Sequence, residues 1–245
     1  MKLFNKDSLG YNLFLKKWLI RIVGLISYKR FRNNLEIEGS EIIYNLPNKN
    51  VLFVSNHQTY FADVAAMTHV FNSSLNGSEN SLSIISYLWN PKLNIYYIAA
   101  KETMTQGLLP KILAYTGSIS VSRTWRENGK DIERSVDTDD LSRIKTALRE
   151  GWLITFPQGT TTPWMPIRKG TAHIIKESKP LVVPITIDGF SESFDKKGLK
   201  RKEKIKLNIK IKNPLEIDYK NETIDKIVEK ISIAIEQHQS FREDN

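Results

Sequence analysis

The 245-residue sequence contains no cysteine, which rules out a disulfide framework, a thiolate nucleophile and a cysteine metal site. Its four histidines, at positions 57, 69, 173 and 238, show no metal-ligand spacing such as H-E-x-x-H, so no metal site is expected. A G-x-S-x-G motif is also missing, and with it the nucleophile elbow of α/β-hydrolases. A thioesterase or another lipid hydrolase is therefore only a weak alternative.

Long hydrophobic runs are absent as well. A helix that spans a bilayer needs about 20 apolar residues, and lysine and arginine at positions 16, 17 and 21 interrupt the most apolar segment, residues 13–28. A cleavable signal peptide is not expected either, because the basic residues 29–32 follow this segment in place of a small-residue cleavage site.

The same segment has a helical pattern. Lys17, Arg21, Gly24 and Tyr28 follow one another at helical spacing on a narrow stripe, and most of the remaining circumference is apolar and includes Trp18. We predict an amphipathic helix that lies in a membrane interface. The alternative is that its apolar side packs on the core of the protein.

Positive charge is concentrated in two segments of the chain. Residues 1–32 and residues 195–212 each carry a net charge of +7, and the rest is net negative. Local basic patches of this kind indicate an anionic partner. No recognised motif interleaves aromatic residues with them, so nucleic acid is not expected. The predicted partner is an anionic membrane surface. Lysines alternate with apolar residues at 204–212, which indicates either protection of an exposed strand or membrane contact.

Strand and helix patterns alternate along the rest of the chain. Strands are expected at residues 51–55, 95–99, 118–122, 152–156, 181–187 and 204–212. Helices are expected at residues 63–71, 101–115, 139–149, 171–177 and 224–237, and a polar loop at 72–81. This order predicts an α/β fold with a mixed sheet flanked by helices. We expect an N-terminal membrane-associating helical segment, residues 1–34, and a single catalytic domain, residues 35–245.

Candidate catalytic residues follow the first of these strands. His57 comes directly after Ser55 and Asn56, and Asp63 is close behind. Groups just past the carboxyl end of a strand face the usual ligand crevice of an α/β sheet. A neutral imidazole accepts a proton near neutral pH, and a carboxylate on its other nitrogen would orient it. A histidine near an aspartate, taken alone, is more often structural.

Three further blocks have a similar character. Residues 117–123 (GSISVSR) are a strand that ends in Arg123, and residues 152–162 (WLITFPQGTTT) are an apolar strand broken by a turn. Residues 182–185 (VVPI) are a buried strand that contains proline. Between the last two, Arg168 and Lys169 open a predicted helix, and a helix N-terminus beside cations is a natural anion site. Each block by itself also has a purely structural interpretation.

Taken in order, the four blocks resemble the motifs of the lysophospholipid acyltransferase family, the 1-acyl-glycerol-3-phosphate acyltransferase-like glycerolipid acyltransferases. Asn56-His57 with Asp63 is similar to the family's NH-x4-D, and residues 117–123 are similar to its glycine-to-arginine block. Residues 156–160 (FPQGT) resemble FPEGTR, and residues 183–185 (VPI) resemble VPV. The resemblance covers roughly residues 35–215, and its specificity comes from the order of four motifs.

The resemblance implies an O-acyltransferase of membrane lipid biosynthesis. His57 would deprotonate the hydroxyl of a lyso-lipid acceptor, which attacks an acyl thioester, and Asp63 would orient His57. The donor would be acyl-carrier protein or acyl-CoA, a co-substrate with no other cofactor. Substrate-binding residues would be Asn56, Arg123, Phe156, Pro157, Gln158, Gly159, Thr160, Thr161, Arg168 and Lys169. The protein would work at the cytoplasmic face of the membrane, as a peripheral or monotopic protein.

One departure from the family pattern concerns the catalytic pair. Five residues separate His57 from Asp63, where the family has four. The turn must absorb the extra residue, or else the pairing is imperfect. The longer spacing is the main support for an alternative of another class, a catalytically weak homologue that acts as a membrane-binding protein.

Two other departures concern the acceptor. Gln158 stands where the family has glutamate, and Thr161 where it has arginine, so a phosphate ligand is lost unless Arg168 or Lys169 replaces it. The sequence therefore favours a singly anionic or zwitterionic acceptor, such as an amino-acid lyso-lipid of the lyso-ornithine type. The alternative is a strict 1-acyl-glycerol-3-phosphate acyltransferase that makes phosphatidic acid.

Overall fold

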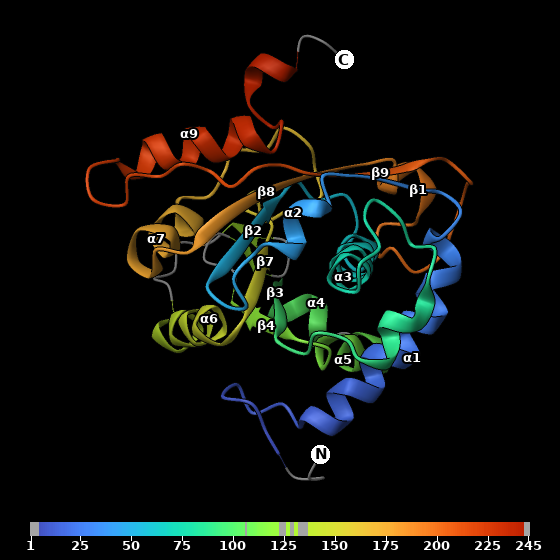
Figure 1. Ribbon diagram of the computed structural model, residues 1–245. Coiled ribbons are helices and arrows are strands. Elements are labelled where there is room, and N and C mark those ends of the chain that lie inside the picture. The colour runs from blue at the N-terminus through green and yellow to red at the C-terminus, as the bar shows by residue number, and fades with distance from the viewer. Residues whose placement is uncertain (1–4, 106, 123–125, 128–129, 132–136, 243–245) are drawn as a thin grey trace.

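A seven-stranded sheet forms the centre of the computed structural model, which describes residues 5–105, 107–122, 126–127, 130–131 and 137–242 (Figure 1). The strands are β1 Leu35–Glu38, β2 Val51–Ser55, β3 Ile95–Ala100, β4 Ser118–Val121, β7 Trp152–Thr155, β8 Leu181–Asp188 and β9 Leu207–Ile211, and a separate ribbon pairs β5 Arg126–Glu127 with β6 Lys130–Asp131. Their order in the sheet is β1-β9-β8-β2-β7-β3-β4. Neighbouring strands are parallel except β8 and β9, so the predicted mixed sheet is confirmed.

Helices cover both faces of this sheet. They are α1 Leu13–Phe31, α2 Glu41–Tyr44, α3 Ala62–Leu75, α4 Lys101–Thr105, α5 Leu108–Ala114, α6 Thr138–Glu150, α7 Lys169–Ser178, α8 Phe190–Ser193 and α9 Ile224–Ala234, with 3-10 turns η1 Ile85–Trp89 and η2 Gln239–Phe241. In Figure 1, α1, α3 and α5 lie on one side of the sheet, and α6, α7 and α9 lie on the other. The α/β fold predicted from the sequence is therefore confirmed as three layers, helix, sheet and helix.

The central strands are buried on both faces because both faces are covered. Along β2, Val51 and Phe53 belong to the core beneath α1 and α3, whereas Leu52 and Val54 belong to the core beneath α6, α7 and α9. Successive side chains of a strand point to opposite faces, and each face here requires an apolar residue. His57 thus follows a strand from the middle of the sheet.

All the predicted strands and helices are present, with differences in detail. Residues 101–115 form two helices rather than one, because the chain turns at Gly107, whose φ of +100° is incompatible with a helix. The predicted loop at 72–81 is wrong for its first four residues, which form the last turn of α3. There Ser74 Oγ donates to the carbonyl of Ser40 at 2.6 Å, so the polar side chain is buried with a partner. The short β1, α2 and η1 were not predicted.

Helix α1 packs on the protein through one side only. Tyr28 belongs to the main core, and a Cβ on Gly24 would lie 2.6 Å from a Leu88 methyl. Arg21 donates to the backbone carbonyls of Leu88, at 3.2 Å, and Trp89. The polar stripe predicted from the sequence therefore faces η1 rather than water.

The opposite side of α1 is apolar, and much of it is exposed in the described part of the chain. Its large side chains are between 38% and 60% exposed, and they are Phe14, Leu15, Trp18, Ile22, Leu25 and Ile26. Because apolar residues occupy both the buried and the exposed side, the predicted amphipathic character is not confirmed, and the interfacial location stays a prediction. Among the described residues, no helix is long and apolar enough to cross a bilayer.

The two basic segments of the sequence meet at the C-terminal end of α1. Arg201 Nη1 donates to the backbone carbonyl of Arg30 at 3.1 Å. Lys206, just before β9, pairs with Glu36 at 2.6 Å, and Lys210 of β9 pairs with Glu38 at 2.7 Å. Because β9 lies between β1 and β8, these lysines do not protect an exposed strand edge.

The predicted boundary between the N-terminal segment and the catalytic domain, at residues 34 and 35, falls between α1 and β1. Helix α1 nevertheless contributes Tyr28 and Phe31 to the main core of the sheet domain. Removing residues 1–32 would therefore also remove core side chains, and any test of this segment requires substitutions instead.

Lys16 of α1 is fully buried. Its Nζ lies 4.8 Å from the ring centroid of Tyr11, 4.2 Å from that of Tyr96 and 3.7 Å from Asp7 Oδ2. Burial lowers the pKa of Lys16 to about 8, and the nearby Asp7 only partly offsets this effect. The buried charge therefore destabilises the folded state at neutral pH.

We expect Lys16→Met to raise the free energy of unfolding at pH 7. A folded-state pKa of about 8 against the ordinary 10.5 means that the protonated lysine costs about 3 kcal/mol below pH 8. The wild type should gain this stability as the pH rises from 8 to 10.5, because the unfolded state binds more protons there. Urea unfolding at pH 7 and pH 10 measures both effects. The exposed Lys29→Met is the control, and an equal pH dependence in wild type and Lys16→Met would contradict the prediction.

Candidate active site

A cavity of about 230 Å³ opens at the carboxyl ends of four neighbouring parallel strands. His57 after β2, Phe156 after β7, Ala100 at the end of β3 and Ser122 after β4 all line it. Strands that run parallel end at the same edge of the sheet, so blocks far apart in the sequence converge here. This convergence is what the order of the sequence blocks predicts.

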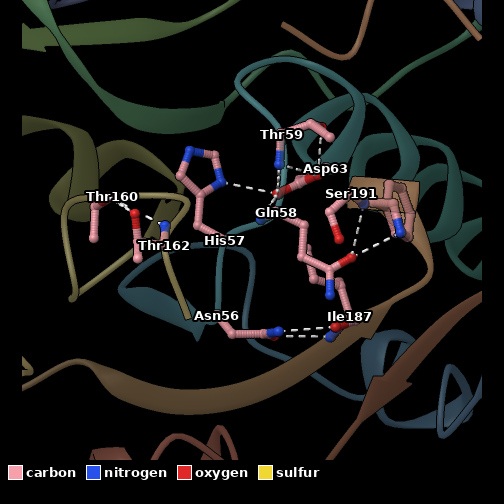
Figure 2. Close-up of polar contacts among 10 residues, drawn as sticks. Asn56, His57, Gln58, Thr59, Asp63, Thr160, Thr162, Ile187 and Ser191 are labelled. Atoms are coloured by element: carbon pink, nitrogen blue, oxygen red, sulfur yellow. Dashed lines mark hydrogen bonds and ion pairs between the residues drawn. The ribbon is translucent and has the colours of Figure 1, made fainter. Parts of the chain in front are cut away.

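His57 and Asp63 form a close pair at one end of this cavity. Nδ1 of His57 lies 2.8 Å from Oδ2 of Asp63, which is fully buried in the first turn of α3 (Figure 2). The Asp63 carboxylate also accepts hydrogen bonds from the backbone N–H of Gln58 at 2.7 Å, and from the N–H and hydroxyl of Thr59 at 3.0 and 2.6 Å. An ionised carboxylate only accepts, so Nδ1 of the neutral imidazole carries the proton and Nε2 keeps its lone pair.

The turn between His57 and Asp63 absorbs the extra residue. The N–H groups of Tyr60 and Phe61 donate to the carbonyls of Lys196 and Lys197 at 3.1 and 3.0 Å. Gly198, with φ of +73°, allows this contact, because a Cβ there would lie 2.5 Å from the nitrogen of Ala62. The expected alternative of an imperfect pairing is therefore wrong, and the catalytically weak homologue loses its main support.

The ring of Phe156 stacks on the imidazole of His57. Their centroids are 3.9 Å apart and their planes are inclined by 21°. The stack fixes the plane of the imidazole, while Asp63 fixes its rotation, and Figure 2 shows the second ring nitrogen on the side away from Asp63. The geometry suits a histidine that accepts a proton from a group in the cavity.

Asn56 and Gln58, which flank His57, attach the turn to the following elements. The side chain of Asn56 accepts from the N–H of Ile187 and donates to its carbonyl, both at 2.8 Å (Figure 2). Gln58 Oε1 accepts from the N–H groups of Phe190 and Ser191 at 2.7 and 3.2 Å. Asn56 does not line the cavity, and these contacts hold the backbone next to His57; its contact with substrate stays a prediction.

The turn after β7 forms another part of the wall. Pro157, Gly159, Thr160 and Thr161 line the cavity, and their contact with substrate stays a prediction. Gly159 takes φ of +67°, and its N–H donates to the carbonyl of Phe156 at 2.9 Å. These residues follow one another around a tight turn that requires glycine.

Gln158, predicted to bind substrate, does not line the cavity in this structure. Its Nε2 donates to the carbonyl of Met165 at 2.9 Å and to Oε1 of Gln237 at 3.0 Å, and the side chain is buried. Both partners are acceptors, and an ionised glutamate at this position could donate to neither of them. The substitution of glutamine for the family's glutamate is thus explained by packing against the C-terminal segment.

Of the two cations that open α7, one lines the cavity. Arg168 is part of the wall, together with Gly170 and Thr171 of the first turn of the helix. Lys169, also predicted to bind substrate, does not line the cavity, and its Nζ pairs with Asp225 of α9 at 2.7 Å. Arg123 lies outside the described residues. In the part of the chain that the structure describes, no three His, Asp or Glu side chains are grouped to hold a metal ion.

Two features of the site were not predicted. The hydroxyl of Thr59 donates to the Asp63 carboxylate. The presence of a hydroxyl residue between His57 and Asp63 in the sequence could have indicated this contact. Asp140 of α6 lines the cavity, and its Oδ2 accepts from the N–H of Ser122 at 2.8 Å. The sequence predicts Asp140 only as a favourable residue near a helix start, because the direction of its side chain depends on how α6 packs on the sheet.

An apolar cavity of about 60 Å³ adjoins the main one, between α1, α3 and η1. Its wall includes Ile20 of α1, Phe61 and Leu88, and it shares Val64 and Tyr97 with the wall of the main cavity. The two cavities are therefore neighbours on either side of these residues.

Comparisons with known proteins agree with this geometry. The family model described as Acyltransferase matches residues 34–188, which include the His57–Asp63 pair, so the chain belongs to the acyltransferase family and is an acyltransferase. Among solved structures, the crystal structure of the 1-acyl-sn-glycerophosphate (LPA) acyltransferase PlsC from Thermotoga maritima is similar, with 16% identity and a TM-score of 0.55 over 93% of this chain and 79% of that chain. A similarity at this identity establishes the fold. A search of curated proteins found no match.

Proposed function

We propose that this acyltransferase moves a fatty acyl group from an acyl thioester to the hydroxyl of a lyso-lipid. The observation that carries the proposal is the His57–Asp63 pair, which faces a cavity of about 230 Å³. Nε2 of His57 takes the proton of the acceptor hydroxyl as the oxygen attacks the thioester carbonyl, and the proton then passes to the departing thiolate. Asp63 stabilises the transient imidazolium. No acyl-enzyme is needed, which suits a chain without cysteine.

The walls of the two cavities support separate binding places for the acyl chain and for the acceptor headgroup. The apolar cavity beside Val64 and Tyr97 suits an acyl chain, because burial of apolar surface is favourable there. Arg168 and the first turn of α7, with Gly170 and Thr171, suit the anionic part of the acceptor headgroup. The donor is an acyl-carrier protein or acyl-CoA thioester, which serves as co-substrate without a further cofactor.

The acceptor in this proposal is singly anionic or zwitterionic, for example an amino-acid lyso-lipid. Thr161 lines the cavity where the family has arginine, so the wall lacks one forked donor for a phosphomonoester. Strict use of 1-acyl-glycerol-3-phosphate is the second candidate. Arg168 in the wall favours it, and the similar protein from Thermotoga maritima is described as an LPA acyltransferase.

Competition between acceptors tests this proposal. The purified protein receives a labelled acyl thioester with equal amounts of lysophosphatidic acid and a singly charged lyso-lipid of the same chain length. We expect the singly charged acceptor to be used at least as well, and Thr161→Arg to shift the ratio toward lysophosphatidic acid by about ten- to a hundred-fold, since a charge-assisted hydrogen bond contributes about 1.5–3 kcal/mol. A wild-type preference for lysophosphatidic acid above about ten-fold would favour the second candidate. Transfer to neither acceptor would contradict both.

We also propose that the protein works at the cytoplasmic face of the membrane as a peripheral or monotopic protein. Support comes from the exposed apolar side of α1 and from the basic residues that gather at its C-terminal end, where Arg201 meets Arg30. An anionic surface would attract this end of the molecule and an apolar interface would bury the exposed side chains of α1.

A further inference from the structure

Among the described residues, one aspartate stands in the wall of the active-site cavity. Asp140, half-buried on α6, lines the cavity, and only its Oδ2 is occupied, by the N–H of Ser122 at 2.8 Å. Oδ1 accepts no hydrogen bond from any residue in the described ranges. The other charged or titratable side chains of the described wall are His57, Tyr60, Tyr97 and Arg168, and of these only Arg168 carries a fixed charge.

The position of Asp140 is not explained by the helix start alone. Acidic residues are favourable in the first turn of a helix, but Asp137 already caps α6, with its side chain accepting from the N–H of Asp139 at 2.9 Å. The contact with Ser122 requires only an acceptor oxygen, which an amide also supplies. Within the described ranges, the negative charge of Asp140 has no cationic partner and faces the cavity.

The order of the strands gives the approximate distance to the reacting atoms. His57 follows β2 and Ser122 follows β4, three intervals apart in the sheet. Neighbouring strands are about 4.8 Å apart, which gives roughly 14 Å between these two ends. His57 and Asp140 both line the cavity at these ends. A headgroup whose cation lies about eight bonds from the reacting hydroxyl extends roughly 10 Å at the spacing of backbone bonds, and it fits this gap.

We propose that Asp140 binds a cationic amine on the headgroup of the acceptor. The inference rests on the proposed function, because it assumes a lyso-lipid whose hydroxyl lies at His57. Arg168 and the first turn of α7 would hold the anionic part of the same headgroup, so the wall matches a zwitterion. The same carboxylate repels a phosphomonoester, which carries nearly two negative charges, and this favours the zwitterionic acceptor further.

Two acceptors that differ only in the amine provide the test. Lysophosphatidylethanolamine and lysophosphatidylglycerol carry the same phosphodiester, but only the former has an ammonium group. We expect the wild-type kcat/KM to be about ten- to a hundred-fold higher for the ethanolamine lipid, as for one charge-assisted hydrogen bond. Asp140→Asn should remove most of this preference, mainly through KM. Asp139→Asn, at an exposed neighbouring position, is the matched control and should leave the ratio unchanged.

A change in the ligand repeats the test without changing the protein. N-acetylation of the ethanolamine headgroup removes its charge, and it should lower kcat/KM of the wild type by the same factor but have little effect on Asp140→Asn. Equal loss in both proteins, or an unchanged acceptor ratio in Asp140→Asn, would overturn the inference. So would transfer to the glycerol lipid with none to the ethanolamine lipid. If no lyso-lipid is acylated in a His57-dependent manner, the proposed function itself fails.

Discussion

His57→Ala should lower kcat by about 10²–10⁴-fold, the usual range for loss of a general base. In the described structure, the imidazole is not part of the hydrophobic core that stabilises the fold. Its side chain is 14% exposed, it pairs with Asp63 and it stacks on Phe156 at the edge of the cavity rather than within the core. Its removal should therefore leave the fold intact and abolish proton transfer from the acceptor hydroxyl.

The measurement is transfer of a labelled acyl group to a lyso-lipid, with thermal unfolding of each variant as the check on folding. His173→Ala is a suitable control, because His173 is exposed on α7 and does not line the cavity. Near-normal turnover by folded His57→Ala protein would rule out the general-base mechanism. An equal loss in His173→Ala would show that the effect is not specific to the cavity.

The order of motifs made much of this site predictable. His57, Phe156 and Arg168 lie in separate parts of the sequence, yet each follows a strand or opens a helix at the same edge of a parallel sheet. Strand ends and helix starts are local features that a sequence reveals, and parallel pairing then places them together. The same architecture explains why β2 is apolar throughout: its side chains alternate between the two faces of the sheet, and both faces are buried.

Side-chain direction was less predictable. Gln158 lies within the motif but points toward Gln237, while Asp140 lies outside every motif and lines the cavity. Both directions depend on contacts with residues distant in sequence, which a local pattern does not contain. The longer His57–Asp63 turn is a further example, because its shape depends on the segment that contains Gly198.

Helix α1 shows the same limit for surfaces. Its narrow polar stripe looks like the solvent side of a helix, but Arg21 of that stripe contacts the backbone of η1. The guanidinium also lies over the rings of Trp18 and Trp89, at 5.1 and 5.4 Å, and both rings are largely exposed. Exposed tryptophans beside a cation are typical of side chains at a membrane interface. This arrangement sharpens the prediction for membrane binding.

Replacing Trp18, Ile22 and Ile26 together by serine should weaken binding to anionic vesicles by about 50- to 2000-fold. These side chains form one row of α1 and are 44%, 49% and 60% exposed, so their loss removes apolar surface without opening the core. Full burial of such a side chain contributes about 1.5–3 kcal/mol, and roughly half of that is available to a membrane here. Sedimentation with vesicles of anionic and of zwitterionic lipids measures the effect.

The control variant is Ile233→Ser, because Ile233 is 45% exposed on α9, on the other side of the sheet (Figure 1). Binding of the wild type should also weaken as salt rises from about 0.1 to 0.5 M, since basic residues at the end of α1 contribute about 1 kcal/mol each near an anionic surface and salt screens them. If the remaining binding of the triple variant still weakens with salt, the basic residues contribute to binding independently of the apolar side chains. Unchanged sedimentation of the triple variant would exclude this side of α1 as the membrane contact, and an equal loss in Ile233→Ser would assign the contact to the opposite face of the protein.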